Sequence, residues 1–380
     1  MDLSTADPDT VLDTLDRRLV CALQVDGRAG TGRIAEVLGV SARTVTRRLA
    51  RMQQAGLLCV VRMPDVEDAA VGALLLRVRV LRGKVDTIAQ ALADRPDVPF
   101  VDVMLGGQEV GAVMLSDAGA RDRLLYGQLP ATAAVTETTT HAVLHAFSDA
   151  GQWQAGYLDE AEVAALTPAA PVPPPALTPA APVPPPALTP VAPVPPSAPV
   201  PPSAPVPSAA PVPATLTHPA ADRPREKPPL DELDRALLAR LSVDARQSHA
   251  ALAVAVGTPE STVRRRLHRL SAAGLLRTHV TVDPRLLGMA VDANLWLDVP
   301  PGRLAEVGTA LARHPQVHGV FATSGPANLM ATLFCPDHGG LYRFLTGTLG
   351  PLGVDRAETA IVARAVKRAG VALQRPRTRP

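Results

Sequence analysis

The chain has 380 residues, a formal net charge of +2, and 47% apolar but only 3% aromatic residues. This length predicts two to four domains with substantial cores, and so few aromatic side chains argue against a large aromatic cofactor cage or a stacking platform for single-stranded nucleic acid. The three widely spaced cysteines suggest neither a disulfide framework nor a zinc site. The acidic N-terminal segment does not have the pattern of a signal peptide, and no apolar run is long enough to span a membrane. We therefore expect a cytoplasmic protein with no metal and no membrane partner.

Residues 12–62 have the pattern of a winged helix-turn-helix. Leucines at helical spacing predict a first helix at 12–25. Ala35 and Gly39 lie ten and six residues before Val45, which is typical of this motif, because its crossing helices need a small residue and its turn needs a positive φ. The β-prone residues that end the segment predict a wing or a connecting strand.

Residues 41–52, SARTVTRRLARM, are predicted to form the recognition helix. Val45, Leu49 and Met52 share one face, and the other faces carry arginines with almost no acid in the helix to balance them. A solvated arginine face is the alternative, but the motif upstream and an excess of five positive charges over 12–62 favour DNA. The predicted contacts are Arg43, Thr44, Thr46, Arg47, Arg48 and Arg51.

The same pattern returns at an offset of 218, with 22 identities in the 51 positions of 12–62 and 230–280. The chain therefore contains an internal duplication, and its second recognition helix lies in PESTVRRRLHRL at 259–270. The second set of predicted DNA contacts is Ser261, Thr262, Arg264, Arg265, Arg266 and Arg269. Predicted caps are Thr31, Ser41 and Ser248 at helix starts and Gly56 and Gly274 at helix ends.

A weaker repeat after each unit predicts the order strand, helix, strand, strand, helix, strand. The predicted strands are 74–81, 98–105, 110–115 and 135–145 in the first copy, and 291–299, 317–323, 329–334 and 356–365 in the second. This βαββαβ order is typical of the ferredoxin-like plait, whose sheet has helices on one face only. We expect the two bare faces to pair within the chain, with Trp296 opposite Arg77 and Arg79.

Residues 165–229 form a low-complexity segment. It holds 25 of the 40 prolines, in an eleven-residue repeat, ALTPAAPVPPP, that decays along the chain. Such a segment cannot build a core, and we interpret it as an extended polyproline spacer rather than a docking ligand for proline-binding modules. The expected α+β organisation is then a winged helix-turn-helix at 10–64, a ferredoxin-like domain at 70–148, the spacer, a second winged helix-turn-helix at 230–282 and a second ferredoxin-like domain at 286–370.

The chain resembles the Lrp/AsnC (feast/famine) transcriptional regulators. The resemblance rests on LDELDR at 230–235, STVRRRLHRL at 261–270, AGLL at 273–276, Gly325, and Glu358-Thr359. It implies binding to double-stranded DNA and an amino-acid or related effector near the turn between the second and third strands. The implied effector residues are Gly106, Gly107, Glu109, Gly325 and Asn328. The family usually has an aspartate where this chain offers Glu109 and Asn328, and simple hairpin glycines are the alternative interpretation.

The predicted function is a duplicated transcriptional regulator, non-enzymatic, without a cofactor and associated with the nucleoid. Its halves are expected to form an intramolecular pseudo-dimer that associates further into homo-oligomers. One alternative is a siroheme decarboxylase, since those enzymes resemble paired Lrp-like halves. Their sites are rich in histidine, tyrosine and arginine, whereas this chain has only three tyrosines and keeps both arginine-rich helices. The other alternative is an architectural DNA-binding protein without an effector.

Overall fold

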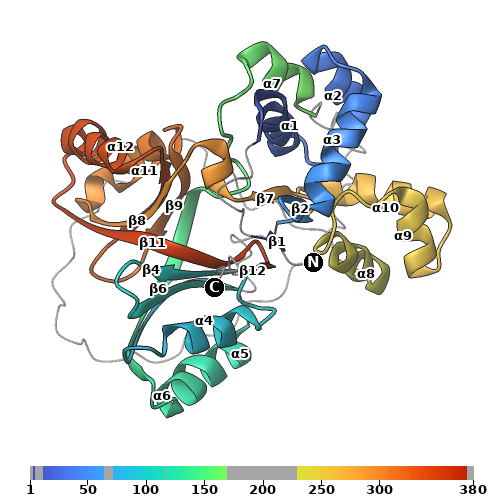
Figure 1. The fold of residues 1–380 in the computed structure, drawn as a ribbon. Helices are drawn as coiled ribbons and strands as arrows, with labels where there is room; N and C mark the ends of the chain where they lie inside the picture. Colours follow the sequence, from blue (N-terminus) through green and yellow to red (C-terminus); the bar gives the residue numbers. More distant parts are fainter. Residues whose placement is uncertain (1–2, 5–11, 64–71, 116, 169–228, 375–380) are drawn as a thin grey trace, which may run out of the picture. The chain divides into compact units, whose positions relative to one another are not determined.

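The computed structural model describes residues 3–4, 12–63, 72–115, 117–168 and 229–374 (Figure 1). Nearly all of the predicted spacer, and the predicted domain residues 10–11, 64, 70–71 and 116, lie outside this part of the chain. The elements of the first half are β1 (Leu3–Ser4), α1 (Thr14–Val25), α2 (Thr31–Leu38), α3 (Ala42–Gln54), β2 (Leu58–Arg62), β3 (Ala73–Val80), α4 (Val85–Ala93), β4 (Phe100–Met104), β5 (Glu109–Leu115), α5 (Ala118–Asp122), η1 (Arg123–Gln128), α6 (Leu129–Ala131), β6 (Val135–Ser148) and α7 (Glu160–Leu166). Those of the second half are α8 (Glu232–Leu241), α9 (His249–Val256), α10 (Glu260–Ala272), β7 (Thr278–Val282), η2 (Pro284–Leu287), β8 (Val291–Asp298), η3 (Pro301–Arg303), α11 (Leu304–Ala312), β9 (Val317–Thr323), β10 (Leu329–Cys335), α12 (His338–Arg343), η4 (Phe344–Leu349), η5 (Gly350–Leu352), β11 (Arg356–Arg368) and β12 (Val371–Gln374).

Each half begins with a three-helix unit that packs around its leucines. The leucines of α1 meet Ile34 of α2 and Val45 of α3, which are both fully buried. Helices α2 and α9 end at Gly39 and Gly257 with φ of 66° and 64°, as the helix-turn-helix spacing predicts. Two of the buried side chains in these units are aspartates, Asp16 and Asp234.

The helix caps follow the sequence except in one place. Ser41 and Ser248 each accept a hydrogen bond from the backbone N–H three residues on, which confirms both as N-caps. The prediction for Thr31 is wrong, because α2 begins at Thr31 itself. Gly30 takes the N-cap position and makes no side-chain hydrogen bond there.

The two sheets have the plait order that the βαββαβ pattern predicts. Their strands run in the order β4-β5-β3-β6 in the first half and β9-β10-β8-β11 in the second, and all neighbours are antiparallel. Leu76 and Val78 of β3 pack under the helices with Ile88, whereas the alternate residues Leu75 and Arg77 line a cavity on the other face. The fold class is therefore α+β and ferredoxin-like, as expected from the sequence.

The two sheets are joined at both edges. β6 pairs with β9 and β11 pairs with β4, so that eight strands form one closed ring (Figure 1). Closure leaves neither sheet with a free edge between the halves. The predicted wing strands also join the halves, since β2 and β7 pair antiparallel with Leu58 opposite Val282. The sequence predicted that the bare faces would meet, but it did not predict this edge-to-edge closure.

Residues 152–166 connect the first half to the second. Helix α7 packs on α1 and α2 and buries Leu166 completely. Upstream of it, the indole N–H of Trp153 donates to the carbonyl of Pro315 at 2.9 Å, and the hydroxyl of Tyr157 donates to the carbonyl of Leu287 at 2.9 Å. None of the helices in the described ranges is long and apolar enough to cross a membrane.

Candidate nucleic-acid interface and central cavity

The recognition helices bury the face that the sequence assigns to the core. Val45, Leu49 and Met52 of α3 are 0 to 4% exposed, and the second copy buries the equivalent residues. The polar face of each helix is therefore available to other groups. This face is strongly basic. Some of its arginines form ion pairs with the first helix of the unit, and the others are exposed to solvent.

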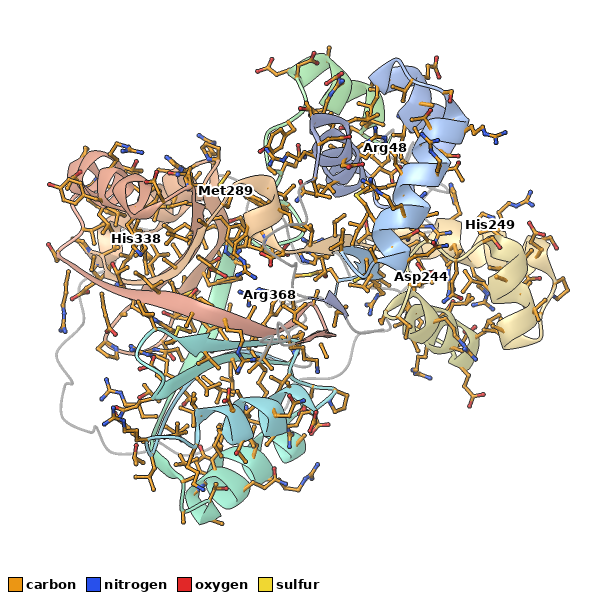
Figure 2. The ribbon with its side chains drawn as sticks, in the orientation of Figure 1. Arg48, Asp244, His249, Met289, His338 and Arg368 are labelled. Atoms are coloured by element: carbon orange, nitrogen blue, oxygen red, sulfur yellow. The ribbon has the colours of Figure 1, made fainter. Side chains whose placement is uncertain are left out.

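Two arginines of α3 are bound by aspartates from α1. Arg48 projects from α3, as Figure 2 shows. Asp16 is 1% exposed and accepts from Arg48 at 3.0 Å and from Arg51 at 2.5 Å. Arg48 also pairs with Asp13, the N-cap of α1. These contacts lower the pKa of Asp13, chiefly through the hydrogen bond from Arg48. Arg48 and Arg51 thus fasten the recognition helix to α1.

The second copy repeats this arrangement. Arg266 pairs with Asp231 at 2.6 Å and with Asp234 at 3.3 Å, and Arg269 also pairs with Asp234, which is completely buried. The acids that balance these arginines lie outside the recognition helices, on the first helix of each unit. The signal was present upstream, where Leu-Asp-x-Leu-Asp stands at the same offset in both copies.

The remaining predicted contacts are oriented toward solvent. Within the described ranges Arg43, Arg47 and Arg265 are exposed and form no ion pair, and Arg264 has only an exposed i,i+4 partner in Glu260 at 3.2 Å. Of the predicted hydroxyl contacts, those exposed are Thr46 and Ser261, and those half-buried are Thr44 and Thr262. These exposed arginines are the groups best placed to reach phosphates or base edges.

The predicted effector residues do not come together in one site. Gly106 and Gly107 have positive φ, as the turn requires, and Gly325 at φ 101° lies so close to His141 that a Cβ would be 2.8 Å from the imidazole Nδ1. The amide of Asn328 is held by both backbone groups of Val299, at 2.7 and 3.0 Å. Asn328 therefore has a structural hydrogen-bonding role between two strands.

Glu109 has an ionic partner rather than an open position. It receives the guanidinium of Arg77 at 2.8 Å, and both line a small pocket of about 200 Å³. The turn that follows Gly325 contributes Pro326 and Ala327 to the same pocket. The structure thus brings Glu109 of one half to the predicted turn of the other half, but the remaining predicted effector residues do not line this pocket.

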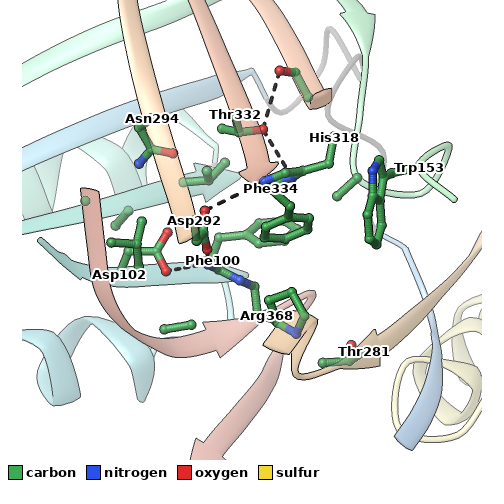
Figure 3. Close-up of a pocket in the computed structure, with 18 of the residues that line it drawn as sticks. Phe100, Asp102, Trp153, Thr281, Asp292, Asn294, His318, Thr332, Phe334 and Arg368 are labelled. Carbon is green, nitrogen blue, oxygen red and sulfur yellow. Dashed lines mark hydrogen bonds and ion pairs between the residues drawn. The ribbon is translucent and has the colours of Figure 1, made fainter. Parts of the chain in front are cut away.

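A larger cavity of about 350 Å³ lies inside the closed ring of strands (Figure 3). Five of the ten aromatic residues and four of the seven methionines line it. These are Phe100, Trp153, Trp296, Phe321, Phe334, Met63, Met104, Met289 and Met330. Composition predicted no aromatic enclosure, but it could not show that the few aromatic side chains gather at a single place.

A charged cluster crosses the cavity from one half to the other (Figure 3). Arg368 of β11 donates to Asp292 of β8 at 2.6 Å and also pairs with Asp102 of β4. Burial raises the pKa of Asp102 to about 7. Burial also acts against ionisation of Asp292, but the charge of Arg368 holds the pKa of Asp292 below its usual value.

His318 of β9 completes the cluster. Its ring stacks on Phe334 at 3.9 Å, its Nδ1 lies 3.1 Å from the hydroxyl of Thr332, and its Nε2 lies 3.8 Å from Oδ1 of Asp292. Burial lowers the pKa of His318 and favours the neutral ring. The described residues contain no group of three or more His, Cys, Asp or Glu side chains that could hold a metal ion.

Comparison with known proteins identifies the family. Residues 12–53 and 230–271 each match the AsnC-type helix-turn-helix domain, and residues 292–372 match the Lrp/AsnC ligand binding domain. An uncharacterized HTH-type transcriptional regulator of Pyrococcus horikoshii is 31% identical over 145 residues, which are 38% of this chain and 91% of that protein. The chain belongs to the Lrp/AsnC family. LrpA of the same organism, also an HTH-type transcriptional regulator, is 28% identical over 140 residues, which are 36% of this chain and 99% of LrpA. These Lrp/AsnC relatives match less than half of the chain, as a tandem duplication of the family's architecture requires.

Solved structures of the siroheme decarboxylase NirDL match both halves of this Lrp/AsnC chain at once. The siroheme decarboxylase NirDL, in co-complex with an iron-uroporphyrin III analogue, aligns over 95% of this chain and 94% of its own, with a TM-score of 0.53 and 12% identity. At that identity the likeness shows a shared fold. It does not transfer the chemistry of NirDL to the present cavity.

Proposed function

We propose that this duplicated Lrp/AsnC chain is a cytoplasmic, sequence-specific transcriptional regulator that reads double-stranded DNA with α3 and α10. The exposed arginines of the two helices, Arg43 and Arg47 in one and Arg264 and Arg265 in the other, carry this proposal. Their ion-paired neighbours hold each helix on its own domain, and the exposed set then reaches the groove and the phosphates. The family relation supports DNA binding in general, and the division of the arginines assigns it to particular side chains.

We further propose that the two halves act as one pseudo-dimer, which presents both helices to two half-sites of the same operator. The strand pairings β6 with β9, β11 with β4 and β2 with β7 support this arrangement. We expect such pseudo-dimers to associate into higher homo-oligomers, as members of the family do.

The two half-sites should be related but unequal. The exposed position that is Thr46 in α3 is Arg264 in α10, and arginine favours guanine where threonine does not. Selection of bound duplexes from a random pool tests this directly. The duplexes that wild type selects should contain two related half-sites that differ in sequence. The exchange variant Thr46→Arg with Arg264→Thr should reverse the order of these two half-sites. If the duplexes bound by wild type showed no enriched sequence, the result would instead favour an architectural DNA-binding protein without an effector.

An amino-acid effector is the second part of the proposal. The pocket of about 200 Å³ offers the ion pair of Arg79 and Glu137, 3.2 Å apart. Both side chains are more than half exposed, so a bound amino acid would separate them at low cost and pair its carboxylate with Arg79 and its ammonium with Glu137. Thermal-shift measurements with the common amino acids test it. Stabilisation by one of them that is lost in Arg79→Gln would support this site, and no stabilisation by any would remove the amino-acid effector from the proposal.

A decarboxylase remains the second candidate because of the fold shared with NirDL. Such an enzyme must bind a carboxylate substrate, and every arginine among the described residues that line the cavity already pairs with a carboxylate of the chain. That pairing favours the regulator. Titration of the protein with an iron porphyrin, followed by its absorbance band, should show no saturable binding, and saturable binding at one equivalent per chain would favour the enzyme.

A further inference from the structure

Four polar residues of the cavity lie in the second half of the duplication and have no polar counterpart in the first half. Arg77 pairs with Thr139 and Trp296 with Glu358, so corresponding positions of the two halves differ by 219. The counterparts of Asp292, Asn294, His318 and Thr332 are Ala73, Leu75, Pro99 and Val113. All four counterparts are apolar. The same strands are built without these polar groups, so the fold itself does not require them.

The hydrogen bonds around His318 leave two acceptors facing each other. When the hydroxyl of Thr332 donates to the carbonyl of Gly319 at 3.4 Å, its oxygen is free to accept from the Nδ1–H of His318 at 3.1 Å. This tautomer makes Nε2 an acceptor, and Nε2 is a buried atom without a hydrogen-bond partner among the described residues.

The second acceptor is a carboxylate oxygen of Asp292. Its Oδ2 accepts from Arg368 at 2.6 Å, and its Oδ1 faces Nε2 of His318 at 3.8 Å, which is too far for a direct hydrogen bond. Nε2 of His318 is a buried acceptor without a donor among the described residues, and such an atom is costly. A ligand group with two or three N–H donors, placed beside both atoms, would satisfy them together.

The charge of the cavity selects a cation. The arginines that line it are each engaged by carboxylates of the chain: Arg77 by Glu109 and Glu358, Arg285 by Asp283, Arg364 by Asp86, and Arg368 by Asp102 and Asp292. An anionic ligand would therefore have to displace an existing ion pair. A cation adds to the two aspartates that share Arg368 and needs no displacement.

The rest of the wall determines the body of the ligand. Phe100, Trp153 and Phe334 surround the cluster, as Figure 3 shows, and four methionines complete an apolar and adaptable lining. Aromatic faces also attract an ammonium group. A volume of about 350 Å³ is at the lower end of ligand cavities and suits a molecule with a single ring or a fused pair.

We propose that the central cavity binds a primary arylalkylamine, with its ammonium group between Nε2 of His318 and Oδ1 of Asp292 and its ring against Phe334 and Trp153. This site is separate from the turn at Gly325 and from the helices that face DNA, so it stands whether or not the chain regulates transcription.

Calorimetric titration of the full chain at pH 7.5 tests the proposal with matched probes. 2-Phenylethylamine and tryptamine carry the ammonium, 2-phenylethanol is neutral and 3-phenylpropionate is an anion of similar size. At least one amine should bind at one equivalent per chain, about tenfold or more tighter than the alcohol, and the carboxylate should not bind. Asp292→Asn and His318→Phe should each weaken the amine about tenfold or more and leave the alcohol unchanged.

The matched control is Asp298→Asn, which changes an exposed aspartate on the same strand and should bind the amine as wild type does. Circular dichroism and thermal unfolding report whether each variant folds. Should Asp292→Asn not fold, the ratio of amine to alcohol affinity in wild type and in His318→Phe still decides. Binding of the carboxylate as tight as that of the amines, equal binding of alcohol and amines, or no binding by either amine would overturn the proposal.

Discussion

The guanidinium of Arg77 on β3 lies 5.4 Å from the centre of the Trp296 ring on β8, the residue at the corresponding position of the other half. Arg77 also donates to Glu109 of its own half at 2.8 Å and to Glu358 of the other half at 2.6 Å. All of these side chains except Glu358 are mostly buried. This one arginine therefore links the two sheets by charge and by stacking.

Replacement of Arg77 should destabilise the chain. Arg77→Met keeps most of the side-chain volume but leaves Glu109 without its main counter-charge, and breaking such a pair costs about 3 kcal/mol. Urea unfolding followed by circular dichroism measures the loss. Arg121→Met is the control, because the pair of Arg121 with Asp122 is exposed and should contribute less than about 1 kcal/mol. Equal losses in both variants would show that Arg77 does not link the halves.

Substitutions of two neighbouring arginines of α3 should affect different properties, DNA binding in one case and folding stability in the other. Arg47→Ala removes an exposed, unpaired guanidinium, so it should weaken DNA binding and lower the salt dependence by about one unit if the contact is to a phosphate. Arg48→Ala leaves Asp13 and the buried Asp16 short of a donor, so it should lower the free energy of unfolding by about 1–3 kcal/mol.

Fluorescence anisotropy across a salt series and urea unfolding separate these two effects. The pair Arg265→Ala and Arg266→Ala repeats the comparison in α10. An Arg47→Ala variant with wild-type affinity and salt slope would exclude this side chain from the DNA interface.

The two halves should stay together when the chain is cut within the proline repeat. Three strand pairings, β6 with β9, β11 with β4 and β2 with β7, hold them without help from the spacer. A protease site placed in the repeat should give two fragments that elute with the intact chain from a sizing column. The unmodified chain treated with the same protease is the control. Fragments that separate, each as its own homodimer, would refute the intramolecular pairing.

Two buried groups should give opposite pH dependence. The pKa of Asp102, which faces Arg368 and Asp292, is raised to about 7 by burial. Between about pH 4 and 7 the folded chain keeps a proton that the unfolded chain releases, so this contribution to stability is lost as the pH rises toward 7. In Asp102→Asn, the free energy of unfolding should therefore rise with pH by about 1.4 kcal/mol per unit more than in wild type.

His279 acts in the other direction, since burial lowers its pKa to about 4. Below about pH 6.5 the unfolded chain binds a proton at His279 that the folded chain does not bind. The contribution of the neutral, buried ring to the free energy of unfolding is therefore lost as the pH falls to 4. His279→Gln should make the pH profile shallower, and Asp102→Asn should make it steeper, in urea unfolding at pH 4.5, 5.5 and 6.5. Shifts of the same sign in both variants would contradict these assignments.

Local patterns predicted most of the fold. The apolar spacing of Val45, Leu49 and Met52 gave the buried face of α3, and alternating strands with turn glycines gave both plaits, because these features depend on neighbours within a few residues. The ion pairs of Arg48 and Asp16 were within reach of the same reasoning, since the duplication repeats both partners at a fixed offset.

The cavity could not be predicted in this way. Asp102 and Arg368 are separated by 266 positions and meet only because β4 and β11 become neighbours when the ring closes. Edge pairing of strands leaves almost no mark on the sequence of either strand. His318 could not be identified from the sequence either, because it is a single histidine within the residues predicted to form a strand.

Fusion of two copies into one chain frees the cavity from an evolutionary constraint. In a dimer of identical subunits every substitution appears twice, so an aspartate that suits one wall must also be tolerated on the opposite wall. Here Asp292 and His318 face the interior once, and their counterparts Ala73 and Pro99 have stayed apolar. One chain then provides a single binding event with no second identical site, and its saturation curve should be hyperbolic, with a Hill coefficient of about one, rather than sigmoidal.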